Sequence, residues 1–80
     1  GHVNNSKYLA WMYEGLDFEF LQHHVPRNIH LKYVKEIHYG HDIISRVEQK
    51  DLSTKHEIVT QGTVHAQACI EWRSIEESRL

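Results

Sequence analysis

The chain has 80 residues, of which 40% are hydrophobic and 25% are charged, so it has room for one folded domain with a small core. Its formal net charge of −2 gives no electrostatic reason to expect a nucleic-acid partner, and it contains neither an apolar run of membrane-spanning length nor a visible signal peptide. Because Cys69 is the one cysteine, an internal disulfide is excluded, and we expect a reducing, cytoplasmic setting.

The first predicted element is a helix over about residues 6–22. Asn4 and Asn5 stand at its start and are of a residue type that commonly caps helix N-termini. Gly15 lies inside the pattern, where we expect it to let a strand approach closely, and Pro26 excludes a longer helix. Apolar side chains recur every three or four positions along one face, namely Leu9, Met12, Leu16 and Phe20.

From Asn28 onward the polarity alternates with a period of two, which predicts strands. The expected strands cover about residues 28–39, 43–48, 56–60 and 63–73. Turn-forming residues separate them, at Gly40, at residues 51–53 and at Gln61-Gly62.

The last strand has the cleanest alternation. Its apolar face includes Ala66 and Ala68, which leave room for a bulky element such as the helix, and its polar face includes His65. The tail that follows, residues 74–80, is polar and is expected to fray.

A helix followed by four antiparallel strands predicts an α+β fold in which a curved sheet wraps a long central helix. The edges of such a sheet are open, and in an oligomer another copy or another domain covers them. Four short strands cannot bury all the aromatic side chains of the helix, so we expect a further partner surface or an acyl-binding pocket. The aromatic residues concerned are Tyr8, Trp11, Tyr13, Phe18 and Phe20.

The eight histidines do not form a metal-binding pattern. No pair of histidines lies four positions apart on the predicted helix, and no cysteine pair accompanies them. We therefore expect neither a metal nor another cofactor. Nothing in the sequence around Cys69 suggests an activated thiol, so an inert cysteine is expected there.

The first residues, Gly1-His2-Val3-Asn4-Asn5, place an imidazole directly ahead of the predicted helix. Unpaired backbone N–H groups and the positive end of the helix dipole lie at this end, so the group could polarise a substrate carbonyl. This is an unusual start for a domain, and it suggests that the chain begins within or just after an active-site loop. The simpler interpretation is that His2 is a terminal residue without a role and that Asn4 and Asn5 only cap the helix.

The stretch from residue 1 to residue 11 resembles the His-Val-Asn-Asn-x-x-Tyr-x-x-Trp segment of acyl-acyl-carrier-protein thioesterases. Residues 31–36 resemble the strand of that family that ends in a functional Glu, residues 40–42 resemble the turn that follows, and residues 71–73 resemble the last strand. These enzymes carry two hot-dog repeats in one chain. The resemblance therefore implies that residues 1–80 form a single, partial hot-dog domain, the C-terminal repeat truncated at its first strand. Single-hot-dog acyl-CoA thioesterases share the Gly-His-Val-Asn-Asn start and are an alternative.

The resemblance also implies which residues form the site. The family uses an Asp-x-Asn-x-His motif and a Glu on a later strand, and by position His2 and Glu36 match these two as catalytic residues. The Asp and the Asn of the motif would precede Gly1, so this chain by itself is expected to lack part of the catalytic set. Ile37 stands where plant members have Cys, which argues against a cysteine nucleophile. The residues expected to bind substrate are Asn4, Asn5, Tyr8 and Trp11.

The chemistry of thioester hydrolysis fits these residue types. The reaction needs an activated water and donors aimed at the developing oxyanion. Glu36 could deprotonate the water, His2 could orient it or the carbonyl, and backbone N–H groups at the helix start could stabilise the oxyanion. Without the resemblance, Glu36 fits a solvated carboxylate equally well, and Tyr8 and Trp11 fit a hydrophobic core.

Two functions of different classes follow. The first is an acyl-ACP thioesterase that releases free fatty acid in fatty acid biosynthesis, with the acidic acyl carrier protein as partner. The second is a non-catalytic hot-dog half that serves dimerisation or acyl binding. The first predicts that His2 and Glu36 lie close together near the helix N-terminus. The basic residues that could bind the carrier are Lys7, Arg27, Lys32 and Lys35.

Overall fold

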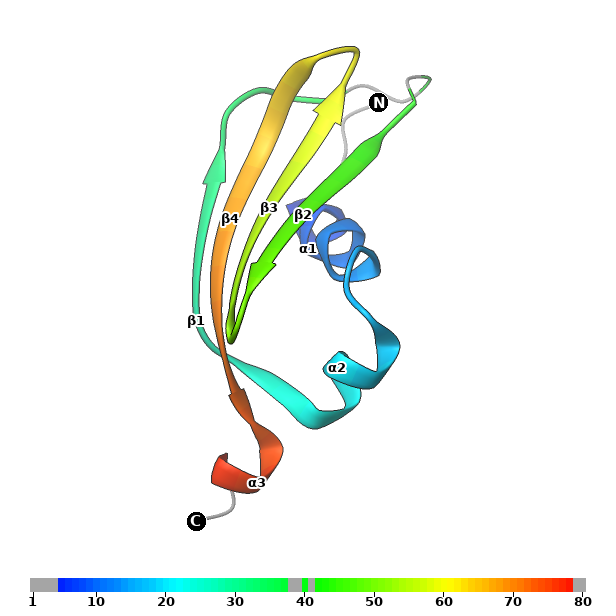
Figure 1. The fold of residues 1–80 in the computed structure, drawn as a ribbon. Coiled ribbons are helices and arrows are strands. Elements are labelled where there is room, and N and C mark those ends of the chain that lie inside the picture. The colour runs from blue at the N-terminus through cyan, green and yellow to red at the C-terminus, as the bar shows by residue number, and fades with distance from the viewer. Residues whose placement is uncertain (1–4, 38–39, 41, 79–80) are drawn as a thin grey trace.

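The computed structural model describes residues 5–37, 40 and 42–78. The elements in chain order are α1 (Asn5–Glu14), α2 (Phe18–His23), β1 (His24–Tyr33), β2 (Ile44–Lys50), β3 (Ser53–Thr60), β4 (Thr63–Ser74) and α3 (Ile75–Ser78). The strands form one antiparallel sheet in the order β1-β4-β3-β2, and the sheet curves around α1 (Figure 1). The expected α+β arrangement of a helix wrapped by a curved sheet is confirmed.

The single long helix predicted over residues 6–22 is wrong, because the structure divides it into α1 and α2. The last turn of α1 tightens, with the backbone N–H of Gly15 donating to the Met12 carbonyl at an N···O distance of 3.2 Å. Asp17 then has an extended backbone (φ −62°, ψ 137°) ahead of α2. The apolar stripe survives the break, since Leu16 between the two helices is still buried.

The expectation for Gly15 is confirmed. A Cβ atom added to this residue would lie 3.2 Å from Cγ1 of Val47 on β2, which is closer than most such contacts. The missing side chain therefore lets the C-terminal end of α1 rest against the β2 edge of the sheet.

β1 begins at His24, earlier than the predicted start at Asn28, and so contains Pro26. A proline is tolerated here because β1 is an edge strand and its register with β4 shifts between Pro26 and Asn28.

β1 ends at Tyr33, whereas the alternation predicts a strand to residue 39, a position outside the described residues. The backbone N–H groups of Val34 and Lys35 both donate to the carbonyl of His65, at N···O distances of 2.8 and 3.2 Å. Because the two N–H groups share one acceptor, the regular hydrogen-bond ladder between β1 and β4 ends here. Glu36 was predicted to lie on the first strand, and that is wrong: it lies in the segment 34–37 that follows β1.

The remaining strands lie where the alternation predicts them, with shifted ends. Gln61 and Gly62 both have positive φ, 47° and 83°, which is the geometry of a two-residue type I′ hairpin between β3 and β4. Asp51 has a φ of 55° in the β2–β3 turn. The tail does not simply fray, because residues 75–78 form α3 directly after β4 (Figure 1).

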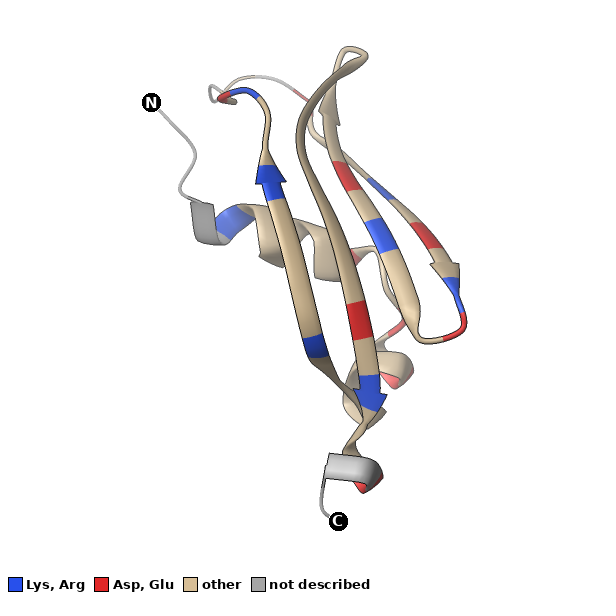
Figure 2. Cartoon of the chain, turned by 90° about the vertical axis from the view of Figure 1, so that its left-hand side faces the viewer, with Lys and Arg blue, Asp and Glu red and all other residues tan. Residues whose placement is uncertain are grey.

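The core lies between α1 and the inner face of the sheet. Ala66 and Ala68 are buried there, so the expectation that they face the helix is confirmed. On the opposite face the strands carry exposed polar side chains, and Figure 2 shows acidic and basic residues mixed along them. The buried hydrophobic cluster consists of Tyr8, Met12, Leu16, Ile37, Ile58, Ala66, Ala68, Ile70 and Trp72. No helix in the described part of the chain is long and apolar enough to cross a membrane.

Three buried residues of this core form a polar chain. The indole Nε1 of Trp72 donates to Oγ1 of Thr54 at 2.8 Å, and Oγ1 of Thr54 lies 2.7 Å from Nε2 of His56. Because the Thr54 oxygen accepts from Trp72, its own hydrogen can be donated to His56.

We expect His56 to make the stability of the fold depend on pH. Burial lowers the pKa of His56 below its ordinary value of 6.5, and the Met12 backbone opposes this only in part. Below that ordinary value the unfolded chain binds more protons than the folded chain, so stability present at higher pH is lost as the pH falls.

The measurement is urea unfolding of the complete gene product and of a His56→Gln variant, each at about pH 7.5 and about pH 5. The difference in unfolding free energy between the two proteins should be smaller at the lower pH. An equal difference at both pH values would contradict the role assigned to His56.

Candidate active site

The structure describes only some of the predicted site residues. His2 and Asn4 lie outside the described residues, and Asn5 is the first residue of α1. Tyr8 is 3% exposed and belongs to the core, and Trp11 is partly buried against it. Contact of these residues with a substrate stays a prediction.

Tyr8 joins the N-terminal half of α1 to the segment that carries Glu36. Its ring meets those of Tyr33 and Trp11 edge-on, at centroid distances of 5.3 and 5.9 Å. Burial raises the pKa of the Tyr8 hydroxyl above its ordinary value of 10.0. A hydrogen bond from the Ile37 backbone opposes the rise, and the proximity of Tyr33 and Glu36 adds to it. The hydroxyl is therefore protonated at neutral pH and lies near Glu36.

Glu36 is an exposed residue next to a buried anchor. Ile37 is 1% exposed and belongs to the same hydrophobic cluster as Tyr8, which fixes the end of the segment 34–37 to the core. A cavity of about 220 Å³ opens beside Glu36, enough for several water molecules. It is lined by Lys35, Glu36, Ile37, Thr60, Gln61, Thr63 and His65.

His65 is a residue of this region that the sequence pattern misplaces. The alternation puts it on the polar face of the last strand, but the structure buries it to 6% exposure. The reason is a β-bulge: Val59 pairs with Val64 and Ile58 pairs with Ala66, so His65 is the extra residue on β4. Simple alternation carries no signal for such an insertion.

The imidazole of His65 contacts the Glu36 segment directly. Its Nδ1 lies 3.1 Å from the carbonyl oxygen of Lys35 and 3.1 Å from that of Glu36. Its Nε2 forms a short hydrogen bond with Oγ1 of Thr60 at the end of β3. The ring thus links β3 and β4 to the backbone on which Glu36 is mounted.

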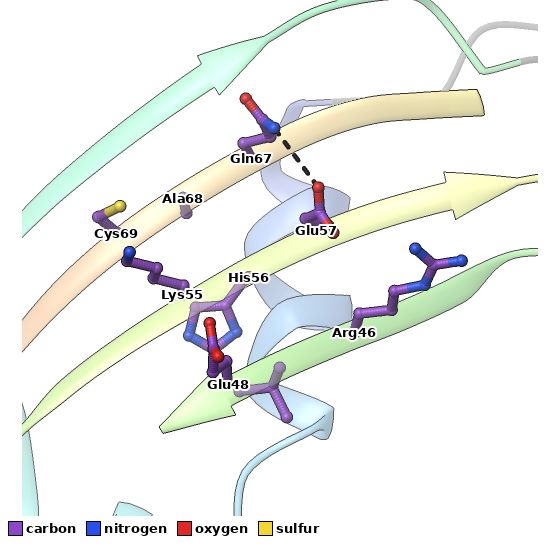
Figure 3. Close-up of a pocket in the computed structure, with 9 residues that line it drawn as sticks. Arg46, Glu48, Lys55, His56, Glu57, Gln67, Ala68 and Cys69 are labelled. Atoms are coloured by element: carbon purple, nitrogen blue, oxygen red, sulfur yellow. Dashed lines mark hydrogen bonds between the residues drawn. The ribbon is translucent and has the colours of Figure 1, made fainter. Parts of the chain in front are cut away.

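A larger hollow of about 560 Å³ lies on the outer face of the sheet, away from the helices (Figure 3). Its exposed lining combines basic and acidic side chains, and the Gln67 amide donates to Glu57 at 3.4 Å. Cys69 lies beside Lys55 in the paired strands and is exposed. Of the predicted site residues that the structure describes, namely Asn5, Tyr8, Trp11 and Glu36, none lines this hollow. Within the described residues, no group of three or more His, Cys, Asp or Glu is placed to hold a metal ion.

An antiparallel sheet in the order β1-β4-β3-β2 curved around a helix is the hot-dog fold, which the likeness to solved thioesterases confirms. Residues 1–74 match the acyl-ACP thioesterase C-terminal domain. The chain belongs to that family.

Three solved structures show the same fold. The 12:0-ACP thioesterase from Umbellularia californica is 27% identical, with a TM-score of 0.85 over 91% of this chain and 28% of its own. A thioesterase from Thermus thermophilus, solved with coenzyme A and Zn, is 21% identical, with a TM-score of 0.74 over 90% of this chain and 65% of its own. A predicted thioesterase from Bacillus stearothermophilus is 21% identical, with a TM-score of 0.67 over 92% of this chain and 67% of its own.

This chain therefore spans 28% of the length of the Umbellularia protein. No curated protein sequence matches it.

Proposed function

We propose that the complete protein hydrolyses fatty acyl thioesters carried by acyl carrier protein and releases free fatty acid in fatty acid biosynthesis. The observation that carries this proposal is the contact of Tyr8 with Tyr33 and with the backbone of Ile37. Because Tyr8 lies early in α1, this contact brings the helix end that follows His2 toward Glu36. Membership of the acyl-ACP thioesterase family and the 27% identity to a 12:0-ACP thioesterase support the reaction and the carrier.

In this proposal Glu36 accepts a proton from a water molecule, and the water oxygen attacks the thioester carbonyl. The oxyanion that forms is stabilised by backbone N–H groups at the start of α1, whose first turn contains no acidic residue to offset the positive end of the helix dipole. The thiolate of the carrier leaves and takes up a proton. The cavity beside Glu36 supplies room for the attacking water.

His2 is proposed to orient the carbonyl or the water. Asn4 and Asn5 are proposed to contact the thioester, and Tyr8 and Trp11 to contact the acyl chain.

The sheet has two edge strands, β1 and β2. We propose that a second hot-dog domain or another copy of the protein covers an edge, since an exposed edge strand can pair with further chains. The reaction is proposed to take place in the cytoplasm.

The test is steady-state hydrolysis by the complete gene product on acyl-ACP and on acyl-CoA with the same acyl chain, followed by release of the free thiol. We expect turnover on both, with a higher kcat/KM on the carrier protein. Binding of acyl chains without turnover of either substrate would support the non-catalytic alternative. Equal or higher kcat/KM on acyl-CoA would contradict the choice of carrier.

The choice of carrier also predicts an electrostatic effect on KM. Lys7 and Lys32 are exposed, and Lys32 lies on β1, the strand that leads to Glu36. The double substitution Lys7→Glu and Lys32→Glu should raise KM for acyl-ACP several-fold, by on the order of 1 kcal/mol of lost attraction, with little change for acyl-CoA.

The matched control is Lys50→Glu at the β2–β3 hairpin, on the opposite edge strand. It should leave both KM values unchanged. An equal rise in KM for the two substrates in the double variant would count against docking of a carrier at this surface.

A further inference from the structure

We infer that His65 is the positioning residue for Glu36: its Nδ1–H donates to the carbonyls of Lys35 and Glu36, and the Thr60 hydroxyl, which can donate, satisfies Nε2 in that tautomer. This inference rests on the proposed function, in which Glu36 acts on the thioester.

The tautomer follows from the partners of the ring. Both atoms near Nδ1 are backbone carbonyl oxygens, which only accept hydrogen bonds, so Nδ1 must carry a hydrogen. In the neutral ring Nε2 is then an acceptor, and the hydroxyl of Thr60 is the group that donates to it. The two carbonyls thereby fix the Nδ1–H tautomer, and Thr60 is compatible with it because a hydroxyl can donate as well as accept.

The backbone carbonyl of His65 also binds the segment 34–37. Its carbonyl accepts from the N–H groups of Val34 and Lys35, while its ring donates to the carbonyls of Lys35 and Glu36. One buried residue therefore satisfies both donors and acceptors of the segment 34–37. The β-bulge is what lets a single residue do this, because it turns the His65 ring inward out of the regular alternation.

This arrangement matters for the reaction because Glu36 does not sit on a strand. Its backbone lies beyond the last β1 residue in the β1–β4 ladder, so the direction of its side chain depends on how the segment is held. A misplacement of a catalytic group by about 1 Å can cost about 10²-fold in rate. His65 and Glu36 line the same cavity, so the hydrogen bonds of His65 lie next to the place where the reaction is proposed to occur.

The first test measures the tautomer of His65 directly. Long-range nitrogen–proton correlation spectra of the complete gene product, recorded at a pH where the ring is neutral, should identify His65 as the Nδ1–H tautomer. The Thr60→Val variant should keep the Nδ1–H tautomer, because the two carbonyl acceptors remain. The Nε2–H tautomer in the wild-type protein would overturn the inference, whatever the protein hydrolyses.

The second test separates positioning from packing with a matched pair of variants. In His65→Asn the amide nitrogen lies about as far along the side chain as Nδ1, so the donor to the two carbonyls is kept. In His65→Gln the amide lies near the place of Nε2, so the contact with Thr60 is kept and the donor to the carbonyls is lost. Urea unfolding of both variants gives the folded fraction with which each kcat is corrected.

For acyl thioester hydrolysis, His65→Gln should lower kcat roughly 10- to 100-fold with little change in KM, and His65→Asn should retain kcat within a few-fold of wild type. Equal losses of kcat in the two variants, or losses explained by the folded fraction, would show a structural role only. Absence of acyl thioester hydrolysis by the wild-type protein would instead remove the proposed function, and full turnover by Glu36→Gln would remove the role of Glu36 as the base. The tautomer of His65 is measured independently of both.

Discussion

Glu36→Gln in the complete gene product is expected to lower kcat for acyl thioester hydrolysis by roughly 10²- to 10⁴-fold, the range for loss of a general base. The amide has nearly the same shape as the carboxylate but cannot accept the proton of a water molecule. Since Glu36 is exposed, the variant should remain folded under the assay conditions. The measurement is steady-state release of the free thiol from acyl-ACP, with urea unfolding recorded on the same preparations.

The matched control is Glu48→Gln, an exposed carboxylate on β2 that lines the hollow on the outer face of the sheet. It should leave kcat and KM unchanged, because that hollow is separate from the cavity beside Glu36. Unchanged turnover in Glu36→Gln, with the protein folded, would refute the assignment of Glu36 as the base. An equal loss in both variants would point to a general effect of charge.

Local patterns predict the parts of this fold that depend on near neighbours. The alternation of β4 and the Gln61-Gly62 turn are properties of a few adjacent residues, and both lie where the sequence predicts them. The helix is different. Leu16 and Phe20 continue the apolar stripe of α1 in sequence, but the chain leaves the helical conformation at Asp17, and the close approach of β2 at Gly15 involves Val47, which is distant in the chain.

Local sequence patterns predict the candidate site less well than they predict the strands. The alternation of polar and apolar residues continues past Tyr33 in the sequence. The strand nevertheless ends there, because the carbonyl of His65 accepts hydrogen bonds from the N–H groups of both Val34 and Lys35. His65 itself becomes buried through a bulge that shifts the register by one residue. Glu36 could be singled out only through the resemblance to a family, since its residue type and exposure fit an ordinary surface carboxylate.

Trp72→Ala is expected to have the largest effect on stability, lowering the unfolding free energy by about 3–5 kcal/mol. Trp72 is 3% exposed on β4, and its ring meets Tyr13 of α1 at 5.6 Å and Phe20 of α2 at 5.2 Å. It therefore anchors both halves of the divided helix to one strand. Truncation removes both aromatic contacts and the indole donor to Thr54 at once.

The matched variant Trp72→Phe separates packing from hydrogen bonding. Phenylalanine keeps an aromatic ring near Tyr13 and Phe20 but has no N–H group, so the buried Thr54 oxygen loses its donor at a cost of about 1–3 kcal/mol. Urea unfolding of the complete gene product should rank wild type above Trp72→Phe and Trp72→Ala lowest. Equal destabilisation of the two variants would contradict the role given to the aromatic contacts, because those contacts with the two helices would then contribute nothing measurable. The loss of unfolding free energy would be due to the hydrogen bond to Thr54 and the polar chain that leads to His56.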